Sequence, residues 1–184
     1  MKTPDCTIIG GGIAGLSTAI ALQQKGFSVA LFESAPEIRA VGAGISLAPN
    51  AVKALRALGL EAEVTAKGKV LESMDILSQD GASINIVDTQ LLTEKYHAPH
   101  LAIHRADLHQ ILLSKVLGDV VRTGKRAVSA QQNTDGVEVT FHDGSTHQAR
   151  ALIVADGIHS PIRKQTVPGS EPRYAGYTCW RAVI

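Results

Sequence analysis

The chain has 184 residues, of which 45% are hydrophobic and 19% charged, and its formal net charge is +1. This composition supports a buried core and excludes long disorder, and the balanced charge gives no reason to expect a nucleic acid or a membrane surface as partner. Cys6 and Cys179 are too few for a disulfide framework or a zinc site, so a cytoplasmic setting is expected. The nearly uncharged stretch Thr7–Leu22 contains four glycines, which argue against a signal peptide or membrane span.

The N-terminal part has the pattern of a strand, a helix and a second strand. The apolar run Cys6–Ile9 ends at a glycine and predicts a buried strand. Ile13–Lys25 has helical spacing, and Gly26 follows as a stop signal. Ser28–Phe32 predicts a second buried strand that is closed by Glu33. Together these segments have the size of a parallel crossover unit.

The middle of the chain predicts a loop, a helix and two strands. Pro36–Pro49 is rich in glycine and proline and is expected to be a loop. Asn50 is a suitable N-cap for a helix over Ala51–Leu58. Lys69–Ser78 and Ser83–Val87 are expected to be strands on either side of a turn.

The second half predicts one helix followed mainly by strands. Ala106–Leu117 is amphipathic and predicts a helix, and Val120–Arg122 is expected to be a short parallel strand. Three alternating segments then predict an antiparallel sheet: Ala127–Gln132, Gly136–His142 and Thr146–Arg150. Ala151–Ala155 is a continuous apolar run, which is typical of a buried strand.

These elements predict an α/β fold, a Rossmann-like domain with a parallel sheet and a small antiparallel β-sheet insertion. Tyr174–Ile184 alternates like the start of a new strand. No partner strand follows it, and unpaired ladder groups are costly, so we expect a chain that is cut within a longer protein and that can self-associate through this strand.

A glycine-rich motif stands between the first predicted strand and helix. Gly10, Gly12 and Gly15, with Ile13 and Ala14 between the last two, fit G-x-G-x-x-G. The glycines permit a tight turn, close approach of a pyrophosphate, and close packing of helix on sheet. An acid, Glu33, lies 23 positions after Gly10 (33 − 10), which suits hydrogen bonds to ribose hydroxyls. The motif predicts NAD or FAD binding, and its spacing does not choose between them.

Four further segments carry a family resemblance. They are VGAGISLAPN at residues 41–50, HRADL at 104–108, ADGIHSPIR at 155–163 and YAGYTCWR at 174–181. In this order, behind the glycine motif, the sequence resembles the flavin-dependent aromatic hydroxylases, which are group A FAD monooxygenases acting on salicylate, hydroxybenzoate or urate. The resemblance runs through the whole chain. The family's later G-D-x-x-H-like segment has no counterpart here.

The resemblance implies roles for residues outside the glycine motif. Arg105 is expected to contact FAD, and the backbone of Gly42, Ala43 and Gly44 to approach the flavin. Asp156 and Gly157 are expected to help position the pyrophosphate, and the backbone of Ala127 to meet the adenine. It also implies a division into residues 1–172, the incomplete FAD-binding domain, and 173–184, the first strand of a substrate-binding domain.

The reaction implied by the resemblance uses FAD, NAD(P)H and O₂. Hydride passes from NAD(P)H to FAD, and a flavin C4a-hydroperoxide then hydroxylates an aromatic or heteroaromatic small molecule. No catalytic side chain is assigned, because such residues in the family mostly lie beyond residue 184. No metal site is expected, since the histidines lack a ligand pattern. An NAD-binding dehydrogenase module and a non-catalytic truncated or split-gene product remain as alternatives.

Overall fold

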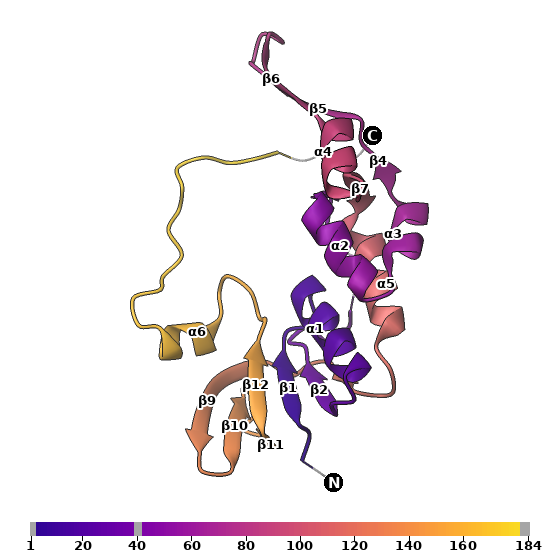
Figure 1. The fold of residues 1–184 in the computed structure, drawn as a ribbon. Coiled ribbons are helices and arrows are strands. Elements are labelled where there is room, and N and C mark those ends of the chain that lie inside the picture. Colours follow the sequence, from indigo (N-terminus) through magenta and orange to yellow (C-terminus); the bar gives the residue numbers. More distant parts are fainter. Residues whose placement is uncertain (1–2, 39–41, 181–184) are drawn as a thin grey trace. The chain divides into compact units, whose positions relative to one another are not determined.

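The computed structural model describes residues 3–38 and 42–180, which form two compact units (Figure 1). The described part of unit 1 consists of residues 3–38 and 112–180, and that of unit 2 of residues 42–111. Within these described ranges, no helix is long and apolar enough to cross a membrane. Each unit is built around a sheet of its own.

Unit 1 contains a four-stranded sheet in the order β12-β1-β2-β8, in which all neighbours run parallel. Its strands are β1 (Cys6–Ile9), β2 (Val29–Phe32), β8 (Val121–Arg122) and β12 (Ala151–Val154). Helix α1 (Ile13–Gln24) connects β1 to β2 and lies along them (Figure 1). The predicted β-α-β unit and the parallel placement of the short strand near residue 121 are confirmed.

Apolar packing explains why these segments take this form. Ile8 and Leu31, at the centres of β1 and β2, are fully buried, and so is Leu16 of α1. Because buried apolar side chains lose their contact with water, such burial contributes about 1.5–3 kcal/mol for each large aliphatic residue. The helix ends one residue earlier than predicted, and Gly26 follows with a positive φ of 82°. Glycine tolerates this left-handed backbone at no steric cost.

A three-stranded antiparallel sheet, in the order β11-β10-β9, forms the second layer of unit 1. It consists of β9 (Ala127–Asn133), β10 (Gly136–Phe141) and β11 (Thr146–Ala149), and it confirms the predicted insertion. Helix α6 (Pro161–Thr166), which was not predicted, contacts β9. A common core joins these parts to the parallel sheet and consists of Ile9, Phe32, Ala127, Val139, Phe141 and Ile162.

Unit 2 contains a three-stranded antiparallel sheet, a separate hairpin and four helices. The sheet has the order β3-β7-β4, with β3 at Gly44–Leu47, β4 at Lys69–Val70 and β7 at Leu101–His104. The hairpin pairs β5 (Ser73–Leu77) with β6 (Ser83–Asp88). The helices are α2 (Pro49–Ala57), α3 (Glu61–Lys67), α4 (Thr89–Tyr96) and α5 (Arg105–Lys115), the last of which runs on into unit 1.

Three predictions for unit 2 are wrong, and one of them is the single strand predicted over Lys69–Ser78, which is divided into β4 and β5 of two different sheets. Helix α2 begins at Pro49, and its N-cap is Ala48, whose side chain makes no capping hydrogen bond. Asn50 is therefore inside the first turn, because proline suits the first helical position, where no backbone N–H is needed. The segment Pro36–Pro49 is not all loop, since β3 forms within it by pairing with β7. Helices α3 and α4 were not predicted.

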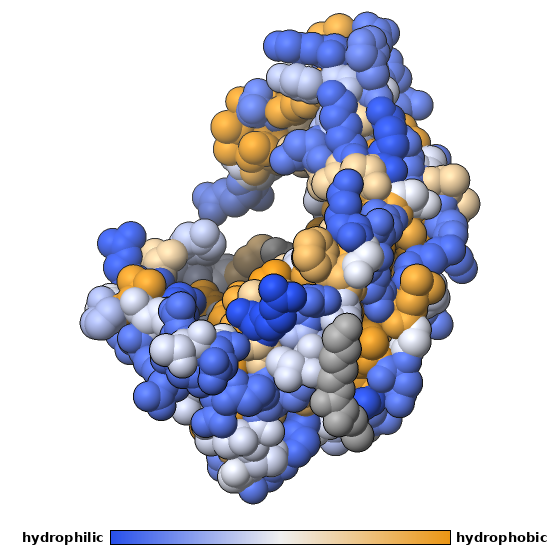
Figure 2. Space-filling model, turned by 60° about the horizontal axis from the view of Figure 1, so that its bottom comes forward, coloured by the Kyte–Doolittle hydropathy of each residue, from blue (hydrophilic) through white to orange (hydrophobic). Residues whose placement is uncertain are grey.

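The last described residues, 171–180, form no helix or strand. The strand predicted over Tyr174–Ile184 is thus absent up to residue 180, and residues 181–184 lie outside the described part. The described ranges offer this segment no ladder partner, and an extended chain without one is not a strand. Tyr174, Tyr177 and Trp180 are largely exposed, and hydrophobic side chains also reach the surface elsewhere (Figure 2).

Candidate functional site

The turn from β1 into α1 is shaped by two glycines that leave no room for a side chain. Gly10 has a φ of 106°, and a Cβ there would lie 2.3 Å from the carbonyl oxygen of Ala155. A Cβ on Gly15 would lie 1.9 Å from the carbonyl oxygen of Gly10. The turn is therefore held tightly between the end of β12 and the first turn of the helix. This is the role that the motif predicts for its first and third glycines.

The second glycine of the motif stands in open space instead. Nothing lies within 4 Å of a Cβ built on Gly12, which is the N-cap of α1. No side chain caps this helix, and no acid lies in its first turn. Ile13 and Ala14 follow in that turn and are not buried. The N–H groups and the positive end of the helix dipole can thus meet an anion, which approaches the backbone where Gly12 has no side chain.

Glu33 directly follows β2, and its side chain is hydrogen-bonded to this turn. Its Oε2 accepts a hydrogen bond of 2.7 Å from the backbone N–H of Gly11, while its Oε1 accepts from the N–H of Ala35 at 2.8 Å and the hydroxyl of Ser34 at 3.0 Å. Sequence reasoning missed the role of Gly11. A Cβ there would lie 3.1 Å from Oε2, so the run of three consecutive glycines, of which Gly11 is the middle one, was the available signal.

The carboxylate of Glu33 is stabilised in its charged form. Partial burial raises the pKa of Glu33. The hydrogen bonds from the N–H groups of Ala35 and Gly11 and from Ser34 lower it by more than burial raises it, so the pKa lies below the ordinary value. Glu33 is only partly buried, so its carboxylate can also meet the hydroxyl of a ribose.

The segment after β12 lies beside the same turn. A Cβ on Gly10 would approach the Cα of Asp156 to 3.0 Å, so Asp156 is at the carboxyl end of the sheet, next to the glycine motif. Gly157 follows with a φ of 86°. Ser160 accepts a hydrogen bond from the N–H of Arg163 and caps α6, and Arg163 Nη2 donates to the carbonyl of Ile158 at 2.7 Å. These bonds hold the loop that follows Asp156.

Ala127 is buried at the start of β9, within the core of unit 1. The two residues before Arg126 form hydrogen bonds to the residues that follow β2. The N–H of Lys125 donates to the carbonyl of Glu33 at 2.8 Å, and the N–H of Gly124 donates to the carbonyl of Ala35 at 2.8 Å. The structure therefore brings the predicted adenine-side segment next to Glu33. Ala127 itself presents no free polar side chain to a ligand.

In unit 2 the predicted flavin-side residues come together. A Cβ on Gly42, whose φ is 122°, would lie 3.0 Å from Cδ of Arg105. The N–H of Arg105 donates to the carbonyl of Ala43 at 3.1 Å, and Gly44 pairs with His104 across the strands. Glycine at position 42 thus makes room for the Arg105 side chain. Within this unit, Gly42, Ala43, Gly44 and Arg105 form one local group.

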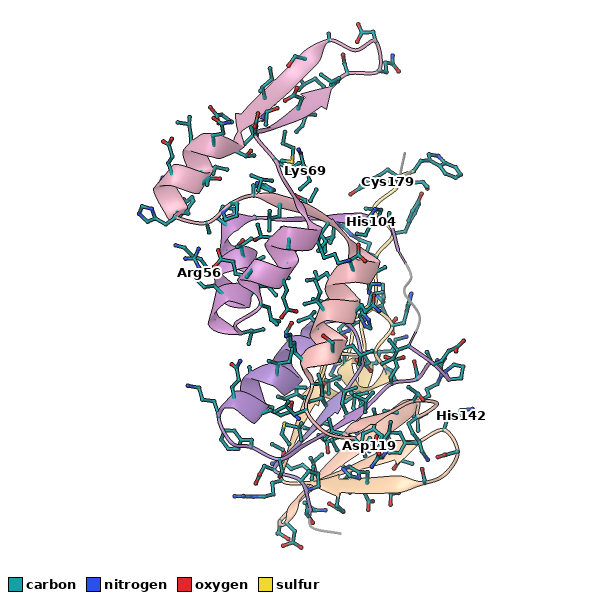
Figure 3. All side chains as sticks on the ribbon, turned by 90° about the vertical axis from the view of Figure 1, so that its right-hand side faces the viewer. Arg56, Lys69, His104, Asp119, His142 and Cys179 are labelled. Atoms are coloured by element: carbon teal, nitrogen blue, oxygen red, sulfur yellow. The ribbon has the colours of Figure 1, made fainter. Side chains whose placement is uncertain are left out.

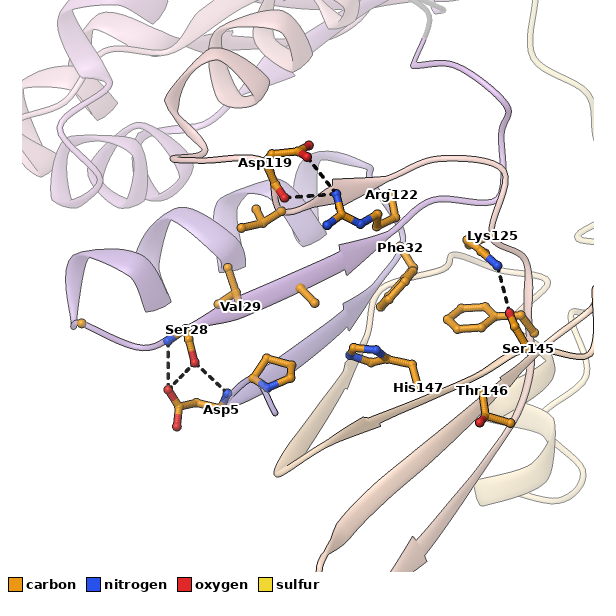
Figure 4. Close-up of a pocket in the computed structure, with 15 residues that line it drawn as sticks. Asp5, Ser28, Val29, Phe32, Asp119, Arg122, Lys125, Ser145, Thr146 and His147 are labelled. Atoms are coloured by element: carbon orange, nitrogen blue, oxygen red, sulfur yellow. Dashed lines mark hydrogen bonds and ion pairs between the residues drawn. The ribbon is translucent and has the colours of Figure 1, made fainter. Parts of the chain in front are cut away.

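A pocket of about 620 Å³ in unit 1 is distinct from the glycine turn (Figure 4). It lies along β2 and β11 and includes Phe32 and His147, whose rings meet edge to face at 4.7 Å. Burial lowers the pKa of His147, whose Nε2 lies 3.0 Å from the hydroxyl of Thr7. The cations of the pocket have acidic partners, as in the 3.2 Å pair of Arg122 with Asp119. None of the predicted cofactor residues lines this pocket.

Comparisons with known proteins agree with the geometry. Residues 3–175 match the FAD binding domain family. The chain is 39% identical over 181 residues to 3-amino-4-hydroxybenzoate 2-monooxygenase of Streptomyces cremeus, covering 96% of this chain and 45% of that protein. It is 38% identical over 184 residues to 3-hydroxybenzoate 6-hydroxylase of Polaromonas naphthalenivorans (strain CJ2), covering 96% and 45%.

A solved structure is similar as well. Klebsiella pneumoniae HpxO complexed with FAD and uric acid superposes with a TM-score of 0.76 at 34% identity, over 87% of this chain and 41% of that chain. The chain thus spans less than half the length of the curated relatives described above.

Proposed function

Because the chain belongs to the family of FAD binding domains, we propose that it is the FAD-binding portion of a monooxygenase that hydroxylates an aromatic or heteroaromatic small molecule. The observation that carries the proposal is the turn at Gly10–Gly15, with its uncapped helix N-terminus next to the carboxylate of Glu33. NAD(P)H and O₂ are its proposed co-substrates. FAD, when bound, accepts hydride from NAD(P)H and activates O₂.

The residues of unit 1 fit the adenosine diphosphate half of FAD. The first-turn N–H groups at Ile13, Ala14 and Gly15 face the open space at Gly12 and would bind the pyrophosphate. The partly buried carboxylate of Glu33 would accept a hydrogen bond from the ribose. Glu33 also disfavours a 2′-phosphate at this position, because two negative groups would meet there. A cradle of this shape binds and orients the cofactor but moves no proton itself.

Two loops complete the proposed cofactor contacts. Asp156 and Gly157 follow β12 at the carboxyl end of the sheet, where ligands bind in open α/β folds, and would position the pyrophosphate. In unit 2 the guanidinium of Arg105 would contact FAD oxygens, and the backbone of residues 42–44 would approach the flavin. The backbone of Ala127 would meet the adenine.

The substrate class comes from the relatives, whose names specify hydroxylated benzoates. We propose a hydroxylated aromatic or heteroaromatic acid as substrate, in the cytoplasm. We also propose that residues 1–172 belong to the FAD-binding domain and that residues 173–184 lead into a substrate-binding domain. Self-association of the isolated chain would use this exposed C-terminal segment.

The test begins with the visible absorption spectrum of the purified chain after gel filtration, followed by titration with FAD and separately with NAD. We expect a flavin spectrum that elutes with the protein, or FAD affinity well above that for NAD. Tight NAD binding without flavin binding would overturn the proposal. Oxidation of NAD(P)H that a hydroxybenzoate stimulates, measured on the protein extended to the length of its relatives, tests the hydroxylase activity.

A further inference from the structure

The open face of the β3-β7-β4 sheet in unit 2 carries hydrogen-bond donors. Strand register places Ser46 opposite Ala102, and Lys69 opposite Ala102 on its other side. In the next row, Gly44 is opposite His104. The positions just named alternate along the strands and are more exposed than their neighbours. Buried side chains on the other face include Leu47, Leu101 and Ile103. One face of the sheet is therefore open and polar.

A pocket of about 440 Å³ lies on this face. Its basic lining consists of Lys67, Lys69 and His104, and no acidic residue lines it. Lys69 and His104 lie on neighbouring strands (Figure 3). No bulky side chain stands at the bottom of the pocket, because Gly44 and Ala102 have little or no side chain. A Cβ on Gly68 would approach the carbonyl oxygen of Ala102 to 3.1 Å, so this wall cannot carry a larger residue without shifting.

A buried histidine sets the direction of the Ser46 hydroxyl. His100 is 7% exposed, and its Nε2 lies 2.7 Å from Ser46 Oγ, while its Nδ1 is buried without a partner. A buried N–H without an acceptor is rarer and costlier than an unused acceptor. The ring N–H of His100 is therefore assigned to Nε2, which donates to Ser46 Oγ. The hydroxyl proton of Ser46 is then free to point toward a ligand.

The charges of this face are uncompensated within residues 42–111. Neither Lys67 nor Lys69 forms an ion pair there, and the side chain of His104 makes no hydrogen bond there. Lys67 also lies in the last turn of α3, where a cation complements the helix dipole, so its position alone has an ordinary explanation. Lys69 is on a strand and has no such explanation.

We propose that this face binds the oxyanion group, carboxylate or phosphate, of a small molecule. Lys67 and Lys69 supply the positive charge, and Ser46 and His104 supply directed hydrogen bonds. Lys67, Lys69 and His104 line a depression floored by Gly44 and Ala102, and Ser46 lies opposite Ala102 on the same face, so the anion lies against the backbone of β7. This inference goes beyond FAD binding and needs no residue from unit 1.

The experiment follows backbone amide shifts of the ¹⁵N-labelled chain during titration with benzoate. Benzamide, a neutral molecule of the same shape, and inorganic phosphate are titrated in parallel. We expect benzoate or phosphate, but not benzamide, to shift amides around residues 44–46, 67–69 and 102–104. A response to benzoate alone identifies a carboxylate site, and a stronger response to phosphate identifies a phosphate site.

Variants separate this site from general attraction of anions. Lys69→Gln is expected to weaken anion binding about tenfold, because it removes one of the two ammonium groups that hold the anion. Ser46→Ala is expected to weaken it about threefold. Lys25→Gln, at an exposed lysine beyond the end of α1, is the matched control and should change nothing.

Three results would overturn the inference: no response to either anion, equal responses to benzamide and benzoate, or equal losses in Lys69→Gln and Lys25→Gln. An unchanged amide spectrum outside the face shows that each variant is folded. FAD titration of the same samples keeps the two proposals apart. A chain that binds FAD but no anion refutes this inference alone, and a chain that binds the anion but no FAD refutes the proposed function alone.

Discussion

Substitution of two motif glycines by alanine should have opposite consequences. In Gly15→Ala the new Cβ would lie 1.9 Å from the carbonyl oxygen of Gly10, against about 3.4 Å for an ordinary contact. Since the obstacle is backbone, α1 must move away from β1, and overpacking of this kind costs about 1–3 kcal/mol. For a chain of this length, that loss lowers Tm by roughly 2–12 °C. In Gly12→Ala the Cβ meets nothing within 4 Å, and the φ of −78° suits alanine.

Gly12→Ala should therefore fold almost as stably as the parent chain, with a capping loss of at most about 1 kcal/mol. Its methyl group occupies the space where the proposed pyrophosphate meets the helix N-terminus, so FAD affinity should fall by about tenfold or more. Thermal unfolding without ligand and quenching of FAD fluorescence measure the two effects on the same samples. A Gly15→Ala chain as stable as the parent, or a Gly12→Ala chain that binds FAD equally well, would refute the reasoning.

Further predictions concern the residues that hold unit 1 together. The pKa of Glu33 in the folded chain lies below its ordinary value of 4.5. Its contribution to stability is therefore present above pH 4.5 and is lost as the pH falls through the folded pKa. The free energy of unfolding, measured by urea titration, should fall more steeply in acid for the parent chain than for Glu33→Gln. Phe141→Ala, which removes a buried ring 4.7 Å from that of Phe32, should destabilise unit 1 by about 3–5 kcal/mol in the same titration, and an unchanged midpoint would contradict the assigned core. Ser160→Ala removes the cap of α6 and should lower the stability of this helix by about 1 kcal/mol. Amide hydrogen exchange measures the effect, and in this variant it should be faster in α6 than in β9.

The sheet of unit 1 was predictable because its signals are local. The apolar runs at Cys6–Ile9 and Ala151–Ala155 are too short and too continuous for surface strands, and glycine or Asp-Gly ends each of them. The turn at Asp143-Gly144 likewise marks the antiparallel hairpin that joins β10 to β11. Such patterns depend on neighbours in sequence, and the structure places these elements within one or two residues of the predicted bounds.

Unit 2 was less predictable because its sheet depends on distant partners. Strand β3 lies in a glycine-rich stretch and forms only by pairing with β7, more than 50 residues later, so local composition favoured a loop. The cap of α2 was misassigned because Pro49 and Asn50 both carry helix-start signals, and proline determined the first position. The cofactor roles expected for Arg105 and Gly42 came from family resemblance, and no local pattern predicted that these two residues lie side by side.

Glu33 shows why a motif identifies a site more readily than it describes one. The spacing from Gly10 predicts an acid for ribose, and the structure places that acid beside the glycine turn, where three of its hydrogen bonds hold the protein's own backbone and Ser34. The same carboxylate thus builds the turn before it can bind a ligand. A substitution at Glu33 will consequently mix a structural effect with a binding effect, whereas a methyl group added at Gly12 meets nothing in the protein within 4 Å and so isolates binding. Gly12 is for this reason the sharper probe of the proposed cofactor site.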